Sequence, residues 1–190
     1  MKFGMNLLLW TGELNDSMLP VLEHLKTLGY DGVEVPIFGG EPEQFEPWAK
    51  RFDDLGLERT VVTIRTEVDN PISPDPKVRA AAVEATKRTL DCCQTLGAHF
   101  LCGPIHSAIG LFSGKGPTPD EWKWGVESMK QVAEHAKATD VMLAVESLNR
   151  FETYFLTCAA DTVRFVRDVD HPNCRMMYDS FHANIEEKGI

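Results

Sequence analysis

The sequence lacks the cysteine and glycine patterns that mark two common kinds of binding site. None of its five cysteines forms a CxxC pair, and no other zinc-ribbon spacing occurs. Because five is an odd number, we expect reduced, buried thiols in a cytoplasmic protein. Neither GxGxxG nor GxxxxGKS/T follows the first apolar segment, so a nucleotide-binding fold would lack its phosphate loop.

Positive charge and long apolar runs are also scarce. Lys and Arg total 19 against 29 Asp and Glu, and the net charge of -10 disfavours a nucleic-acid partner. No apolar stretch approaches the ~20 residues of a membrane span, so no membrane partner is expected. Residues 1–10 have one positive charge and no small-residue cleavage site, and we interpret residues 3–10 as a first strand rather than a targeting signal.

The sequence does contain a regular alternation of short apolar runs and amphipathic segments. The apolar runs show no period of two, as expected for parallel strands covered by helices on both sides or around a barrel. The predicted strands are 3–10, 32–36, 59–65, 98–102, 141–146 and 175–179. The predicted helices are 18–28, 43–55, 76–96, 118–139 and 159–169, with a further helix beginning near residue 182.

Two α/β architectures are compatible with this alternation: an open doubly wound sheet and a (β/α)8 TIM barrel. Candidate polar or aromatic residues stand at most of the strand ends, at Trp10, Arg65, His106, Glu146 and Asp179. An open sheet would concentrate them at one switch point, so we favour the barrel. A complete barrel needs about 250 residues. We therefore expect residues 1–190 to be a single domain, the N-terminal portion of a barrel truncated after about six units, with strands 7 and 8 absent or supplied by a partner.

Two neighbouring strand ends carry the same arrangement. Glu146 and Asp179 each close an apolar run, and the 33 residues that separate them correspond to one strand–helix–strand period. Two carboxylates at one sheet edge repel each other unless one pKa rises or a divalent cation binds. Oxygen ligands with few histidines favour Mn²⁺ or Mg²⁺ over zinc. The alternative is that these carboxylates cap the following helices or pair with an arginine such as Arg150.

The motifs VESLNRFE (145–152) and YDSFHANIEE (178–187) resemble the D-tagatose 3-epimerase / D-psicose 3-epimerase group of the xylose-isomerase-like sugar isomerase/epimerase barrels. The resemblance covers essentially the whole chain and includes GYDGVE (29–34) and CGP (102–104). It implies an isomerase of carbohydrate metabolism that epimerises a ketose at C3 through a cis-enediolate. It also implies a divalent metal, Mn²⁺ foremost, with Mg²⁺ or Co²⁺ as alternatives.

The same resemblance implies roles for individual residues. Glu146 would bind the metal and act as one of two acid/base carboxylates, and Asp179 would be a second metal ligand. Glu152 and His182 would contact the sugar. The family's other two ligands, a histidine and a glutamate that is also the second acid/base group, lie on strands 7 and 8. We therefore expect the isolated 190-residue chain to have negligible epimerase activity.

Three further residues at strand ends are candidate substrate contacts. His106 follows the fourth strand, and Arg65 ends the third, where it could bind a phosphate or neutralise a carboxylate. Trp10 could form a wall of the sugar pocket, because aromatic faces suit the C–H surfaces of sugars. The alternatives are that His106 is a loop histidine without contact to a substrate and that Trp10 packs in the core. We interpret Glu34, inside its strand, as a buried and hydrogen-bonded carboxylate.

Two other functions are compatible with the barrel. An endonuclease-IV-like DNA-repair enzyme would need a histidine-rich three-zinc site and a basic face, which six scattered histidines and the charge of -10 disfavour. A non-catalytic barrel fragment would bind a metal or a sugar weakly, or would assemble with a partner. Self-association into a homo-oligomer is left open.

Overall fold

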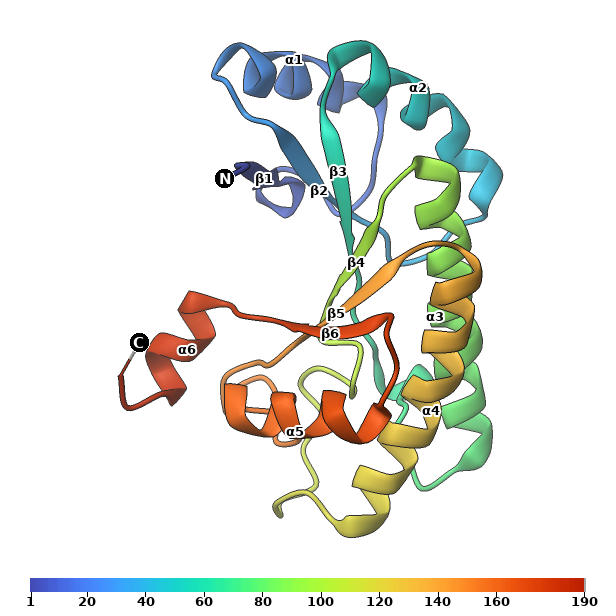
Figure 1. The fold of residues 1–190 in the computed structure, drawn as a ribbon, viewed down its shortest axis with the longest axis vertical. Helices are drawn as coiled ribbons and strands as arrows, with labels where there is room; N and C mark the ends of the chain where they lie inside the picture. The colour runs from blue at the N-terminus through green and yellow to red at the C-terminus, as the bar shows by residue number, and fades with distance from the viewer. Residues whose placement is uncertain (190) are drawn as a thin grey trace.

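The computed structural model describes residues 1–189, which form a parallel sheet with the strand order β1-β2-β3-β4-β5-β6 (Figure 1). The strands are β1 (Gly4–Asn6), β2 (Gly32–Pro36), β3 (Glu58–Val62), β4 (Phe100–Gly103), β5 (Met142–Glu146) and β6 (Cys174–Met177). Each strand pairs in parallel with the next strand of the sequence. Because the strand order never reverses, the sheet is an arc of a barrel and not a doubly wound sheet. The predicted α/β barrel class is confirmed.

The helices lie mainly on the convex side of this arc (Figure 1). They are α1 (Leu19–Thr27), α2 (Glu46–Leu55), α3 (Pro76–Leu96), α4 (Pro119–Ala138), α5 (Ala159–Val169) and α6 (Ser180–Glu186). Short 3-10 helices occur at Leu7–Leu9, Asp16–Met18, Pro42–Phe45 and Glu67–Asp69. In Figure 1, α1 to α5 follow the outside of the sheet, whereas α6 lies on the open side together with the N-terminus. None of the helices in the described residues has the length and apolar character that crossing a membrane requires.

Local capping chemistry sets the boundaries of the two longest helices. The Asp75 side chain accepts a hydrogen bond of 2.8 Å from the Lys77 N–H at the start of α3, and Gly97 ends that helix with a φ of 74°. Thr118 and Glu121 form a capping box at the start of α4. These signals are local in the sequence, so the predicted bounds 76–96 and 118–139 agree closely with α3 and α4.

The first strand is shorter than the sequence predicts. β1 ends at Asn6, and a 3-10 turn replaces the predicted continuation to Trp10. The Asn6 side chain accepts a 2.8 Å hydrogen bond from the Leu8 N–H, which favours the turn over an extended backbone. The third predicted strand also ends early, at Val62, and Arg65 follows it in an isolated bridge to Ala108.

The core lies between the sheet and the outer helices. Leu101 and Val145 of the sheet pack with helix residues such as Leu22, Phe52 and Phe165, and all five are fully buried. Burying apolar surface of this kind contributes roughly 25 cal/mol per Å², and it fixes the strand ends relative to one another. The loops that follow the strands are thereby held at one end of the arc.

Candidate active site

The strand register brings Glu146 and Asp179 together. Glu146 is the last residue of β5 and is paired with Met177 of β6. Asp179 lies two residues beyond Met177 in extended conformation, with φ -96° and ψ 116°. Residues two apart in an extended chain face the same side, so both carboxylates face the same side of the sheet. The sequence-based expectation that these two carboxylates share one sheet edge is met.

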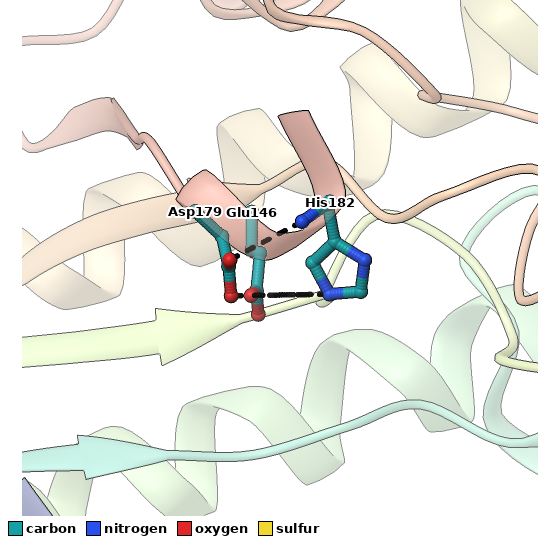
Figure 2. A group of neighbouring side chains, drawn as sticks. All are labelled: Glu146, Asp179 and His182. Atoms are coloured by element: carbon teal, nitrogen blue, oxygen red, sulfur yellow. Dashed lines mark hydrogen bonds and ion pairs between the residues drawn. The ribbon is translucent and has the colours of Figure 1, made fainter. Parts of the chain in front are cut away.

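His182 in the first turn of α6 completes a cluster with the two carboxylates (Figure 2). One ligand atom of each of these three side chains lies within 4.8 Å of the other two. The His182 Nε2 atom is 3.7 Å from Glu146 Oε1 and 3.9 Å from Asp179 Oδ2. The exposed fractions of the Glu146 and His182 side chains are 11% and 10%. The cluster is therefore largely shielded from solvent.

The cluster is strongly acidic. Burial raises the pKa of Glu146 to about 8, and a hydrogen bond with Asp179 together with the Asp179 charge acts in the same direction. The charges of Glu34 and Glu152 raise this pKa further. In the metal-free protein Glu146 therefore holds a proton at neutral pH. A divalent cation would relieve the same repulsion and displace that proton, so the donor set fits a metal with oxygen ligands.

Asp179 has a structural task as well. Its Oδ1 atom accepts hydrogen bonds from the Phe181 and His182 N–H groups, at 2.6 and 3.3 Å, and so caps α6. Its Oδ2 atom faces His182 Nε2 instead. The capping alternative is therefore correct for one oxygen and leaves the other available. The arginine alternative is not realised, because Arg150 pairs with Glu186 at 2.8 and 2.9 Å.

Asn149 connects two of the predicted substrate-binding residues. Its Nδ2 atom donates a 2.7 Å hydrogen bond to Glu152 Oε1 and lies 2.9 Å from His182 Nδ1. Its backbone N–H also donates to His182 Nδ1, at 3.1 Å. Sequence reasoning did not single out Asn149. The only signal was its place in the 145–152 motif, between two carboxylates.

Arg65 and His106 lie below the surface of the protein. The Arg65 guanidinium is 3% exposed and donates to Asp69 at 2.7 Å and to Thr63 at 2.9 Å. His106 is fully buried, and its Nδ1 atom lies 2.9 Å from the Ser107 hydroxyl oxygen. Burial lowers the pKa of His106 to about 3, so its imidazole is neutral.

Trp10 and Glu34 have contrasting surroundings. Trp10 follows the 3-10 turn after β1 and is about half exposed. Glu34 in β2 is partly buried and accepts hydrogen bonds from Asn6 at 2.7 Å and Thr60 at 3.3 Å. Burial raises the pKa of Glu34, and the Asp179 charge adds to the rise. Glu34 is the hydrogen-bonded carboxylate that its position in the strand indicates.

A hollow of about 670 Å³ lies on the inner side of the sheet. Most of its lining comes from the beginnings of β1 to β4, including Lys2, Asp31, Glu58 and His99. The carboxylate cluster lies at the ends of β5 and β6 instead. Chemistry in parallel α/β folds occurs at the carboxyl ends of strands, so we assign the candidate active site to the cluster and not to this hollow.

Comparison with known proteins gives a consistent family. Residues 22–189 match the family described as "Xylose isomerase-like TIM barrel". The chain is 32% identical to a D-psicose 3-epimerase of Agrobacterium fabrum, over 98% of this chain and 66% of that protein. It is 31% identical to an L-ribulose 3-epimerase of Mesorhizobium japonicum, over 100% of this chain and 64% of that protein.

Solved structures agree with this match. An L-ribulose 3-epimerase superposes with a TM-score of 0.92 at 30% identity, over 99% of this chain and 64% of that one. A D-psicose 3-epimerase from Clostridium cellulolyticum, solved with D-tagatose, superposes with a TM-score of 0.89 at 31% identity, over 100% of this chain and 67% of that one. The chain thus spans 64% to 67% of the length of these relatives. Its sequence match and its fold together show that the chain belongs to the xylose isomerase-like TIM barrel family.

Proposed function

We propose that the protein is a metal-dependent ketose 3-epimerase, acting on a free ketose in carbohydrate metabolism. The observation that carries the proposal is the close approach of the largely buried Glu146 and the partly exposed Asp179 at neighbouring strand ends, with His182 beside them. Relatives of about 30% identity named D-psicose and L-ribulose 3-epimerases support the choice of reaction.

Glu146 and Asp179 are the residues that would hold the metal. Both offer carboxylate oxygens, and one oxygen of Asp179 is not used by the helix cap. Oxygen donors favour Mn²⁺, with Mg²⁺ or Co²⁺ as alternatives. When bound, such an ion polarises the C2 carbonyl group and so makes the C3 proton more acidic.

Glu146 is the proposed catalytic carboxylate of this chain. Its side chain ends β5 and is buried beside Asp179, so it can remove or return the C3 proton from one face of the sugar. The family resemblance assigns the opposite face to a second carboxylate on a later strand. Inversion at C3 follows when one group removes the proton and the other returns it.

Glu152 and His182 are proposed to bind the sugar hydroxyl groups, because Asn149 holds them side by side next to the carboxylate pair. Trp10 is proposed as an aromatic wall at the same end of the sheet. For Arg65 and His106, burial and the partners of Arg65 Nη1 and Nη2 and of His106 Nδ1 favour support of the surrounding loops. Arg65 Nε and His106 Nε2 have no partner in the described residues, and direct contact with substrate stays a prediction. A single barrel domain over 1–190, a cytoplasmic location and self-association stay predictions as well.

The test is exchange of the C3 proton. Full-length protein here means this chain together with the two later strands that the family resemblance implies. It is loaded with Mn²⁺ and incubated with D-psicose in D₂O, and NMR follows deuterium at C3 together with formation of the C3 epimer. We expect both, and we expect a chelator or Glu146→Gln to abolish them. Glu23→Gln, on the exposed side of α1, is the matched control and should behave like the unmodified protein. Deuterium exchange that proceeds equally well in the presence of the chelator, or no exchange at all, would contradict the proposal.

The same experiment separates the alternatives. A non-catalytic barrel would show no exchange at C3 even with the metal bound. An endonuclease-IV-like enzyme is disfavoured already, because the clustered ligand set in the described residues has one histidine beside two carboxylates, whereas a three-zinc site needs several.

A further inference from the structure

His182 receives two N–H groups at the same ring nitrogen. The Asn149 backbone N–H donates to Nδ1 at 3.1 Å, and the Asn149 side-chain nitrogen lies 2.9 Å from the same atom. A backbone N–H is only a donor, so Nδ1 must accept and carries no proton. This contact excludes the tautomer protonated on Nδ1.

The orientation of the Asn149 amide is fixed independently. Its Oδ1 atom accepts a 2.9 Å hydrogen bond from the Phe151 N–H, which a side-chain nitrogen could not do. The Nδ2 atom therefore faces Glu152 Oε1, at 2.7 Å, and His182 Nδ1. Asn149 is 2% exposed, so water does not replace these contacts at low cost.

We propose that Asn149 is a positioning residue, which holds His182 with its proton on Nε2 and ties it to Glu152. A neutral imidazole that accepts at Nδ1 carries its proton on Nε2. That N–H lies on the side of the ring that faces Glu146 Oε1 and Asp179 Oδ2, at 3.7 and 3.9 Å (Figure 2). The inference rests on the proposed function in one respect only, that the group recognised next to these residues is a sugar oxygen.

The tautomer decides which members of the cluster bind a metal. A histidine ligand must offer an unprotonated ring nitrogen, and the only such nitrogen of His182 is already occupied by Asn149. His182 is therefore a hydrogen-bond donor to an oxygen, although its position alone would suit a ligand. The metal ligands from this part of the chain are Glu146 and Asp179.

Asn149 also gives the site two groups of opposite polarity. His182 presents a donor at Nε2, whereas Glu152 uses one carboxylate oxygen for Asn149 and presents the other as an acceptor. A hydroxyl group both donates and accepts, so the pair matches one hydroxyl or two adjacent ones. Substrates without a hydroxyl at this place should leave Glu152 unpaired and should bind more weakly.

The first measurement concerns the unmodified protein. Full-length protein labelled with ¹⁵N-histidine is studied by long-range ¹H–¹⁵N NMR at neutral pH, without metal and without sugar, and then with Mg²⁺ as a diamagnetic probe. We expect the His182 proton on Nε2 in both states. A proton on Nδ1, or loss of the Nε2 proton when Mg²⁺ binds, would overturn the proposal whatever any variant does.

The second measurement uses Asn149→Asp, which keeps the size but replaces the amide donor by a carboxylate facing Nδ1. The backbone N–H of residue 149 remains in this variant, but a carboxylate facing Nδ1 favours a proton on that nitrogen over the backbone contact. We therefore expect an Nδ1–H signature in place of Nε2–H. We also expect KM for D-psicose to rise about tenfold or more, because the hydrogen bond from Asn149 to the Glu152 carboxylate is lost. The matched control is Asn173→Asp. Asn173 also donates its backbone N–H to a histidine Nδ1, that of His171 at 3.1 Å, but it lies just before β6, at the opposite end of that strand from the cluster.

If Asn149→Asp changes the His182 signature and KM no more than Asn173→Asp does, Asn149 is not the positioning residue. The NMR readout needs neither turnover nor sugar, so it is separate from the test of the proposed function. An Nε2–H tautomer without any C3 exchange would overturn the epimerase proposal and would support the positioning of His182. If Asn149→Asp fails to fold, Asn149→Ser, which removes the donor to Glu152, takes its place in the KM comparison.

Discussion

Replacing Asp179 with asparagine should separate the two tasks of this side chain. One oxygen caps α6 by accepting from the Phe181 and His182 N–H groups, and the other faces the cluster with Glu146. Asparagine can accept at Oδ1 in the same way, but it offers an amide nitrogen and no charge where the second oxygen stood. The variant should therefore keep the helix cap and lose the metal site.

The two effects have different magnitudes. Asn and Asp are about equally good N-caps, so Asp179→Asn should change the free energy of unfolding of the metal-free protein by no more than about 0.5 kcal/mol. Asp179→Ala also removes the cap and should lower that free energy by about 1 kcal/mol. Metal affinity should fall in both variants, by at least roughly 100-fold, because even the loss of a residue that only supports a ligand costs 10–100-fold.

Two measurements check this reasoning on full-length protein: urea unfolding in the presence of a chelator, and electron paramagnetic resonance of free Mn²⁺ during titration. Asp75 is the matched control, because it caps α3 through the same kind of contact, 2.8 Å to the Lys77 N–H, without neighbouring ligands. Asp75→Ala should lose about the same stability and bind Mn²⁺ normally. The reasoning is refuted if Asp179→Asn binds Mn²⁺ like the unmodified protein, or if it unfolds as easily as Asp179→Ala.

Three further outcomes follow from the structure. The pKa of Glu146 is raised to about 8 by burial and by the carboxylates of Asp179, Glu34 and Glu152, so the folded metal-free protein binds this proton more tightly than the unfolded chain. The free energy of unfolding should therefore fall as pH rises from about 5 to 8, by at most about 1.4 kcal/mol per pH unit from this group. Glu146→Gln should remove that part of the slope when urea unfolding is measured at several pH values in the presence of a chelator. Gly103→Ala should destabilise by about 1–3 kcal/mol, because Gly103 has a φ of 118° and a Cβ there would meet the Thr63 carbonyl oxygen; a change below about 0.5 kcal/mol in urea unfolding would contradict the geometry. Phe165→Ala should cost about 3–5 kcal/mol in the same assay, since Phe165 is fully buried against Phe155 and Trp122, and a loss under about 1 kcal/mol would show that the α5 contact is not part of the core.

The elements that the sequence predicts well are those with local signals. β2 and α5 have the predicted bounds, and α3 begins and ends at the residues that its cap and its closing glycine indicate. The predicted first strand, 3–10, is longer than β1 because its apolar run continues to Trp10, whereas the Asn6 side chain favours a turn of the backbone after three residues. An apolar run therefore indicates a strand but does not locate its end when a side chain competes for the backbone.

The candidate site also contains residues whose placement the sequence predicts and residues whose placement it does not. The spacing of Glu146 and Asp179 predicts their proximity because neighbouring parallel strands end at one edge. The same argument placed Arg65 and His106 at strand ends, but it cannot tell whether a side chain enters the open side of the arc or packs beneath a loop. Both are buried and have partners for some of their nitrogens, whereas Arg65 Nε and His106 Nε2 have none in the described residues. Only the packing of the folded chain determines this.

Asn149 shows why the rest of the site was not predictable. Its side chain matters because the loop after β5 brings it to the first turn of α6, which begins more than 30 residues later. Asp179 caps that helix with one oxygen, and the cap orients the turn that carries His182 toward Asn149. The carboxylate proposed to bind the metal therefore also positions the histidine proposed to bind the sugar. An asparagine between two acidic residues is an ordinary loop pattern. Asn149 acquires its role only because Asp179, after the next strand, caps α6 and so places the His182 imidazole nitrogen next to the N–H groups of Asn149.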